Sequence, residues 1–467
     1  MNIETSLVEK LVKKVMEEMN SIDQVNNFDE YGIFNTMDEA IEAAYIAQRQ
    51  YLKCSISDRE RYIKAIRNVI LKEENLERLS RVTVEETEMG VYEHKYIKNK
   101  LAAEKTPGTE DLVTEAMAGD DGLTLVELSP FGVIGSITPT TNPTETIISN
   151  SIGMLAAGNS VVFSPHPKSK KVSIDIITMM NKALKDEGAP ANLITMVGEP
   201  SIENTNILMN HPKISMIVAT GGPGIVKMAM STGKKAIGAG AGNPPVVVDE
   251  TANIEKAAKD IIDGCSFDNN IPCIAEKEVI AVDSITDYLI FNMKKSGAYE
   301  IKDKEIVDKL TKIVLDENEN LNKDLVGKSA KYILKQINIE VDEDIKVIIA
   351  ETDKDHPWVR HELMMPVLPI VRAKDVDEAI DIAIEAEQGN RHTAIMHSNN
   401  VEKLTKMAKL IQTTIFVKNG PSYAGIGVGG EGYTTFTIAG PTGEGLTSAK
   451  SFARKRRCVL VGGFHIK

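Results

Sequence analysis

A single cysteine, Cys273, stands in a polar loop where its thiol could act as a nucleophile. The loop, residues 267–277, reads Phe-Asp-Asn-Asn-Ile-Pro-Cys-Ile-Ala-Glu-Lys. Apolar residues at helical spacing precede it over 254–262, and the apolar run 279–282 that follows it predicts a buried strand. Loops held between rigid elements expose reactive groups, so a catalytic thiol is one interpretation. A buried structural cysteine is the other, because free cysteines are usually buried.

Three further segments favour the catalytic interpretation. They read Gly-Val-Ile-Gly-Ser-Ile-Thr-Pro-Thr-Thr-Asn-Pro at 132–143, Leu-Ala-Ala-Gly-Asn-Ser-Val-Val-Phe-Ser-Pro-His-Pro at 155–167 and His-Glu-Leu-Met-Met-Pro-Val at 361–367. With Cys273, in this order and with these gaps, they resemble the aldehyde dehydrogenase superfamily. The CoA-acylating branch, and within it the propionaldehyde dehydrogenases of bacterial microcompartments, is the most similar. The resemblance covers nearly the whole chain after its N-terminal segment.

Oxidation of an aldehyde by a thiol enzyme has three chemical demands. A thiolate must add to the carbonyl, donors must stabilise the oxyanion, and a nicotinamide must take the hydride. The resemblance implies that Cys273 is the nucleophile and that the side-chain amide of Asn142 is an oxyanion donor beside the Cys273 backbone N–H. Hydrolytic relatives carry Pro-Trp-Asn-Phe-Pro where this chain has Pro-Thr-Thr-Asn-Pro, so the asparagine is displaced by one position. Its alternative role is to form the turn before Pro143.

Cofactor binding is expected without a GxGxxG fingerprint. Gly238, Gly240 and Gly242 match that spacing only weakly, and two prolines follow where the helix should begin. The resemblance implies NAD bound along one set of residues: Thr138, Pro139, Thr140, Ser164, Pro165, His166, Thr220, Gly221, Gly222 and Gly240. It also places Glu362 at the nicotinamide ribose. Many relatives have a ribose-binding lysine where Ser164 stands, so NAD over NADP is a preference. His166 could contact a diphosphate or be structural.

The segment 239–243 reads Ala-Gly-Ala-Gly-Asn, where hydrolytic members carry Glu-Leu-Gly-Gly-Lys. Their glutamate activates water, and such general-base assistance contributes roughly 100–10,000-fold. A thiol needs less activation because its pKa lies near 8.5. The resemblance therefore implies coenzyme A as the co-substrate that releases an acyl-CoA, with propionaldehyde favoured and acetaldehyde second. A hydrolytic dehydrogenase that forms free acid and a microcompartment structural or cargo-adaptor protein are the alternatives.

Charge and cysteine usage exclude several classes of function. The net charge of −13 argues against nucleic-acid binding, which needs a basic surface. The cysteines at 54, 265, 273 and 458 have no metal-ligand spacing, so we expect no metal and a reducing cytoplasm. No apolar stretch reaches the ~18 residues that span a bilayer, so no membrane partner is expected. Cys265, outside the loop, is expected to be buried.

The hydrophobic pattern predicts an α/β protein. Helical spacing runs over 36–104, and beyond 123 short apolar runs alternate with helices, which is typical of a parallel sheet covered on both faces. Helices are expected near 145–157, 172–187 and 223–231. Strands are expected at 132–138, 160–163, 193–197, 216–218, 246–248, 279–282, 347–350, 367–371, 394–397, 415–417 and 458–462.

The resemblance implies the aldehyde dehydrogenase fold and its division into domains. A Rossmann-like cofactor domain would comprise 21–106 and 129–242, and an α/β catalytic domain would comprise 243–440. Oligomerisation elements would comprise 107–128 and 441–467. In relatives the tail joins a neighbour's sheet, so we expect a homo-oligomer, either a dimer or a tetramer. The basic run 450–457 is expected to be solvated or subunit-facing.

Residues 1–20 are predicted to form an amphipathic helix. Ser6 and Glu9 have capping-box spacing, and a polar stretch over 20–31 follows. Its apolar face comprises Leu7, Val8, Leu11, Val12, Val15, Met16 and Met19. The helix could pack on the body as an ordinary first helix or dock on a partner. It resembles the encapsulation helices that bind shell proteins of bacterial microcompartments, which implies a cytoplasmic protein inside such a compartment.

Overall fold

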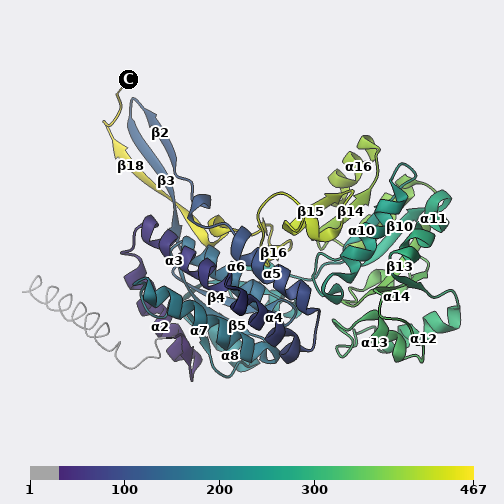
Figure 1. Cartoon of the computed structure of the whole chain (residues 1–467). Helices are drawn as coiled ribbons and strands as arrows, with labels where there is room; N and C mark the ends of the chain where they lie inside the picture. The colour runs from purple at the N-terminus through teal and green to yellow at the C-terminus, as the bar shows by residue number, and fades with distance from the viewer. Residues whose placement is uncertain (1–30, 467) are drawn as a thin grey trace, which may run out of the picture.

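The structure is a computed structural model and describes residues 31–466. The amphipathic helix predicted over 1–20 lies outside the described residues. Figure 1 shows two helix-covered bodies side by side and a narrow arm that projects from one of them. Within the described part of the chain, no helix combines the length and apolarity that crossing a membrane requires.

The first body is built on a six-stranded parallel sheet. Every residue of its central strands β4 and β5 is buried, as expected for strands covered on both faces. Side chains along β5 alternate between two cores: Phe163 joins the core of helices α3 to α7, and Val162 joins that of α2 and α8. In sheet order the strands are β1 (Ile33–Phe34), β6 (Ile194–Val197), β5 (Ser160–Pro165), β4 (Val133–Thr138), β7 (Ile214–Thr220) and β8 (Lys235–Ala239).

The helices of this body begin where their sequences provide caps. Thr36 and Glu39 form a capping box at the start of α2, and Ser55 and Asp58 form one at the start of α3. The helices are α2 (Met37–Tyr51), α3 (Ile56–Ile70), α4 (Glu73–Thr87), α5 (Tyr92–Lys105), α6 (Pro143–Ala156), α7 (Lys170–Asp186), α8 (Ile202–Asn210) and α9 (Pro223–Met230).

The second body is built on a seven-stranded parallel sheet. Val246 faces the core that α10 and α11 cover, whereas Val247 faces that of α15 and α16. In sheet order the strands are β11 (Ala298–Glu300), β12 (Val347–Glu351), β13 (Val367–Ala373), β10 (Glu278–Val282), β9 (Pro245–Val248), β14 (Thr393–His397) and β15 (Ile415–Lys418). The helices are α10 (Ile254–Ser266), α11 (Asp283–Lys295), α12 (Lys304–Val314), α13 (Ala330–Lys335), α14 (Pro357–Arg360), α15 (Val376–Glu387) and α16 (Val401–Ile411).

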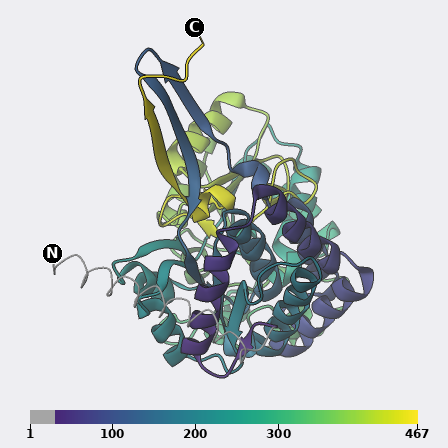
Figure 2. The same cartoon turned by 90° about the vertical axis from the view of Figure 1, so that its left-hand side faces the viewer.

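The arm is a three-stranded antiparallel sheet of β2 (Glu115–Gly119), β3 (Gly122–Pro130) and β18 (Ala453–Val461). Figure 2 shows it extending away from both bodies. The strand predicted at 458–462 is therefore longer and starts at Ala453, because the basic residues before it pair with β3 and stay exposed. The other predicted strands and helices are present with small shifts of their ends. The domain boundaries stay a prediction.

Candidate active site

The loop that carries Cys273 is held in an unusual backbone conformation. It follows α10 and precedes β10, and its residues Asp268, Asn269 and Asn270 have φ angles of 51°, 52° and 66°. Such left-handed conformations cost about 1 kcal/mol or more for residues other than glycine and persist only where the surroundings impose them. Asparagine and aspartate adopt them most readily, which explains the local sequence.

Hydrogen bonds from distant elements impose this conformation. The Val91 N–H donates to Asp268 Oδ1 at 2.7 Å, and the Asp268 N–H donates to His94 Nδ1 at 2.8 Å. The Asn270 amide donates to the Cys265 and Glu276 carbonyls, both at 2.9 Å. The loop is thus rigid on both sides of its left-handed residues, so the thiol that follows is preorganised.

Cys273 is half-buried as a residue, but its thiol lies in an enclosed environment. Burial, followed by the Glu362 carboxylate, raises the pKa of this thiol to about 12, whereas the Lys277 and Lys98 ammonium groups oppose the rise. At neutral pH the thiol is therefore protonated in the free protein. Cys265 is fully buried, as predicted, and burial also raises the pKa of its thiol.

Gly242 connects Cys273 to two further groups. Its N–H donates to the Glu362 carboxylate. A Cβ placed on it would lie 2.7 Å from the Cys273 carbonyl oxygen and 2.8 Å from His392 Cγ. Burial raises the pKa of Glu362 to about 6, and its Oε1 has no hydrogen-bond partner among the described residues. Glu362, expected at the nicotinamide ribose, thus lies close to the thiol.

The sequence analysis missed His392. The residue is 1% exposed, its Nδ1 lies 2.9 Å from Thr393 Oγ1, and its Nε2 has no hydrogen-bond partner within residues 31–466. Burial, assisted by Lys277, lowers the pKa of His392 to about 4, so the ring is neutral at pH 7. No motif surrounds this histidine. Its position just before a predicted strand was the only available signal.

Asn142 reaches the cysteine loop through a buried lysine that the sequence analysis also missed. It is the N-cap residue of α6 and 8% exposed, and its Oδ1 accepts a hydrogen bond from Lys98 Nζ at 2.5 Å. The same ammonium forms an ion pair with Asp268 Oδ2 at 2.5 Å. The structure therefore joins the predicted oxyanion donor to the loop of the predicted nucleophile.

The expected cofactor residues gather at the carboxyl edge of the first sheet. Thr138, Ser164 and Thr220 end or nearly end β4, β5 and β7, which are neighbouring strands. Ligands of open α/β sheets bind at this edge. Thr138 Oγ1 is buried without a hydrogen-bond partner in the described part of the chain, and a Cβ on Gly222 would meet no atom within 4 Å. These observations fit a bound nucleotide.

Four expected cofactor residues have other contacts in this structure. Ser164 Oγ lies 2.8 Å from Thr205 Oγ1, and His166 Nδ1 accepts the Lys168 N–H at 3.1 Å. Thr220 Oγ1 lies 2.9 Å from Thr437 Oγ1. The Gly221 N–H donates to the Ala239 carbonyl at 3.0 Å, so this backbone donor is engaged within the sheet. Pro139 and Thr140 follow β4, Pro165 ends β5, and Gly240 follows β8 beside Pro441.

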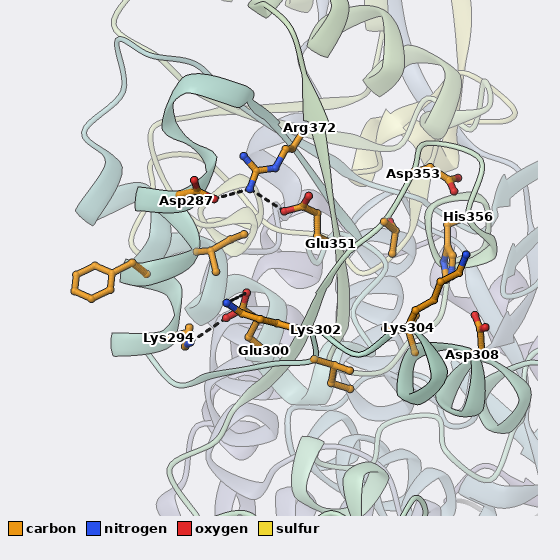
Figure 3. A pocket seen from close by; sticks show the side chains of 15 residues that line it. Asp287, Lys294, Glu300, Lys302, Lys304, Asp308, Glu351, Asp353, His356 and Arg372 are labelled. Atoms are coloured by element: carbon orange, nitrogen blue, oxygen red, sulfur yellow. Dashed lines mark hydrogen bonds and ion pairs between the residues drawn. The ribbon is translucent and has the colours of Figure 1, made fainter.

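A groove of about 750 Å³ lies elsewhere, along β11, β12 and β13 of the second sheet (Figure 3). Its Arg372 forms ion pairs with Asp287 and Glu351, as the dashed lines show. None of the predicted site residues lines it, and its principal cation is neutralised by carboxylates. The groove therefore has no part in the candidate site.

Comparisons with known proteins agree with this geometry. The Aldehyde dehydrogenase family model matches residues 31–440. A curated relative, Propanal dehydrogenase (CoA-propanoylating) of Citrobacter freundii, is 51% identical over 99% of this chain and 100% of its own length.

Solved structures are similar over most of the chain. A Rhodopseudomonas palustris propionaldehyde dehydrogenase with bound CoA and an acylated cysteine is 68% identical, with a TM-score of 0.91 and coverage of 92% of this chain and 98% of that one. A Clostridium phytofermentans propionaldehyde dehydrogenase of a fucose utilisation microcompartment is 54% identical, with a TM-score of 0.91 and coverage of 93% of this chain and 100% of that one. An engineered glycolyl-CoA reductase with bound NADP⁺ is 66% identical, with a TM-score of 0.92 and coverage of 94% of this chain and 99% of that one. The chain therefore belongs to the aldehyde dehydrogenase family.

Proposed function

We propose that this protein oxidises a short aldehyde, with propionaldehyde favoured, to its acyl-CoA, using NAD and coenzyme A through a thioester on Cys273. The proposal rests chiefly on one observation. Lys98 contacts both Asn142 and Asp268, and it thereby links the predicted oxyanion donor to the loop that carries Cys273. Relatives that share this branch act on propanal with CoA, and one holds an acylated cysteine beside CoA. A relative that binds NADP⁺ supports a nicotinamide nucleotide, and the preference for NAD stays a prediction.

The first step forms the bond between the Cys273 sulfur and the aldehyde carbonyl carbon. Because the thiol is protonated at neutral pH, a base must take its proton as this bond forms. The neutral His392 ring, whose Nε2 lacks a hydrogen-bond partner among the described residues, is the group that we assign to this role. Its ring packs against Gly242 at the point where the Cys273 carbonyl also lies.

Addition turns the carbonyl oxygen into an oxyanion. The Cys273 backbone N–H and the Asn142 amide are its donors, and one such donor contributes about 3–4 kcal/mol to stabilising the transition state. A nicotinamide, when bound, accepts the hydride from the former carbonyl carbon. The oxyanion electrons then re-form the C=O bond, which leaves an acyl thioester on Cys273.

Thioester exchange completes the cycle. The sulfur of coenzyme A, having lost its proton, attacks the acyl carbon, and Cys273 leaves as a thiolate that is protonated again. Ala239, at the end of β8, offers no carboxylate to activate water at the position where hydrolytic relatives carry one. This absence favours the thiol acceptor over hydrolysis.

NADH absorbance tests the proposal directly. The protein is assayed with propionaldehyde and NAD, with and without coenzyme A, and the acyl product is identified by chromatography. Sustained turnover that requires coenzyme A supports the proposal. Turnover without coenzyme A would indicate the hydrolytic dehydrogenase, and no turnover in either case would indicate a structural or cargo-adaptor protein.

We also propose a homo-oligomer within a bacterial microcompartment. The arm exposes almost all of β18, including Val459 and Val461 at 55% and 82%, and an unpaired sheet edge of this kind can pair with another chain. A relative from a fucose utilisation microcompartment supports the location. Residues 1–20 are the segment that we assign to binding the shell. Light scattering of the intact chain and of a chain without 453–466 tests the oligomer, because loss of the exposed strand β18 should yield monomers.

A further inference from the structure

Lys98 is a fully buried cation with three acceptors around its ammonium group. It projects from α5, and its side chain is 0% exposed. Its Nζ hydrogen-bonds to Asn142 Oδ1 at 2.5 Å and forms ion pairs with Asp268 Oδ2 at 2.5 Å and Glu145 Oε1 at 2.9 Å. An ammonium group has three donors and no acceptor, so these three contacts engage it completely.

The charges around Lys98 keep it ionised. Burial lowers the pKa of its ammonium, but the Asp268 and Glu145 carboxylates raise it by more, and the net shift is upward. Lys95, one turn earlier on α5, forms an ion pair with Asp268 Oδ2 at 3.0 Å and donates to the Thr141 carbonyl at 2.5 Å. Two ammonium groups and two carboxylates therefore form a buried cluster without net charge.

Of the two lysines, Lys98 and not Lys95 hydrogen-bonds to the side chain of Asn142, and this contact has a directional consequence. The two ends of an asparagine amide are nearly equal in size but opposite in function, because Oδ1 accepts and Nδ2 donates. A donor-only ammonium fixes Oδ1 toward itself. Nδ2 then keeps a single long contact of 3.4 Å with Thr141 Oγ1 and remains available as a donor.

We propose that Lys98 is a positioning residue that selects the amide orientation in which Asn142 donates to the oxyanion, and that its contact with Asp268 sets this donor in register with the Cys273 loop. The inference rests on the proposed role of Asn142. With the amide reversed, Oδ1 would face the oxyanion and repel it.

Two charge-matched variants test Lys98. Lys98→Met with Glu145→Gln removes one cation and one anion, so the cluster stays neutral, but Asn142 loses its partner. Lys95→Met with Glu145→Gln makes the same change of charge and keeps Lys98 on Asn142. The rate of NADH formation is measured in a single turnover with NAD and limiting propionaldehyde, without coenzyme A. Alkylation of Cys273 by iodoacetamide, followed by peptide mass spectrometry, reports on the thiol in a reaction that needs no oxyanion donor.

The Lys98 double variant should slow the single turnover by about 10–100-fold, as expected for a misplaced catalytic group, with alkylation changed by less than about three-fold. The Lys95 double variant should lose far less of its single-turnover rate. Adding Asn142→Ala to the Lys98 double variant should slow the single turnover little further. Equal losses in both double variants, or alkylation that falls together with turnover, would show that Lys98 only supports the loop.

Asn142→Ala alone separates the two proposals. If it leaves the single turnover intact, the assignment of Asn142 as a donor is wrong. If it slows the reaction while the Lys98 double variant does not, the proposal for Lys98 alone is wrong. Asn142→Asp provides a test that keeps Lys98: one carboxylate oxygen would bind Lys98 and the other would face the oxyanion, so the rate should fall below that of Asn142→Ala. A rate equal to or above it would contradict the proposed geometry.

Discussion

A methyl group added at Gly242 should disturb the active site without disturbing the fold elsewhere. The φ of Gly242 is outside the left-handed region, so Gly242→Ala adds no backbone strain and tests space alone. The new Cβ would lie 2.7 Å from the Cys273 carbonyl oxygen and 2.8 Å from His392 Cγ. Ordinary contact begins at 3.4 Å, so these groups must separate by about 0.7 Å.

A shift of this size has a predictable effect on rate. A 1 Å misplacement of a reacting group can cost about 100-fold, so Gly242→Ala should lower kcat by about 10–100-fold. Overpacking of this kind costs about 1–3 kcal/mol of stability, which leaves the protein folded. NADH formation with propionaldehyde and coenzyme A measures kcat, and thermal unfolding monitored by circular dichroism measures stability.

Gly198→Ala is the matched control. A Cβ at this position, after β6, would meet its nearest atoms at 3.5 and 3.6 Å, which are ordinary contacts, and Gly198 lies outside the site. It should retain wild-type kcat. If Gly242→Ala also retains wild-type kcat, neither the Cys273 carbonyl nor the His392 ring needs its observed position, and the geometric argument for the site is wrong.

Three further predictions concern the site, and a fourth concerns residues 1–20. Cys273→Ala should abolish both aldehyde oxidation and acyl-CoA reduction, while Cys265→Ala should retain most activity; the opposite result in either assay would show that the nucleophile is misassigned. Ala239→Glu should raise the yield of free propionate relative to propionyl-CoA, measured by chromatography, and an unchanged yield in a folded variant would contradict our explanation of coenzyme A dependence. Glu362→Gln removes a negative charge that raises the pKa of the Cys273 thiol, so the pH profile of iodoacetamide alkylation should shift to lower pH. The difference from wild type should vanish below about pH 6, because Glu362 is itself protonated there. An unshifted profile would exclude the electrostatic contact between Glu362 and the thiol. Deletion of residues 1–20 should leave specific activity and the melting temperature intact but abolish shell-protein pull-down, whereas a large fall in melting temperature with pull-down unchanged would show that the segment belongs to the core.

Most elements of the two sheets could be predicted because buried parallel strands have a simple signature. The run 246–248 is continuously apolar, and β9 occupies Pro245–Val248 with both faces covered. The arm strand β18 was harder to delimit. Its first half carries the basic residues 454–457, which no burial pattern marks as a strand, and only pairing with β3 places them there.

Local motifs indicated the nucleophile, but the groups around it are remote in sequence. Lys98 and Asp268 are far apart in the chain, and only the packing of α5 against the cysteine loop brings them together. His392 has no motif around it, and its burial beside Gly242 is a tertiary property. The hydrogen bond from Gly221 to Ala239 likewise depends on the pairing of β7 with β8, which sequence spacing does not specify.

The buried cluster of Lys95, Lys98, Glu145 and Asp268 has a consequence for motion. Both lysines and Glu145 belong to the first body, whereas Asp268 belongs to the loop of the second. Separating the bodies at this point would break both ion pairs of Asp268 and expose the cluster to water. These ion pairs link the two bodies beside the cysteine loop, so we expect NADH and coenzyme A to exchange through movements of side chains and loops at the sheet edge rather than by separation of the bodies.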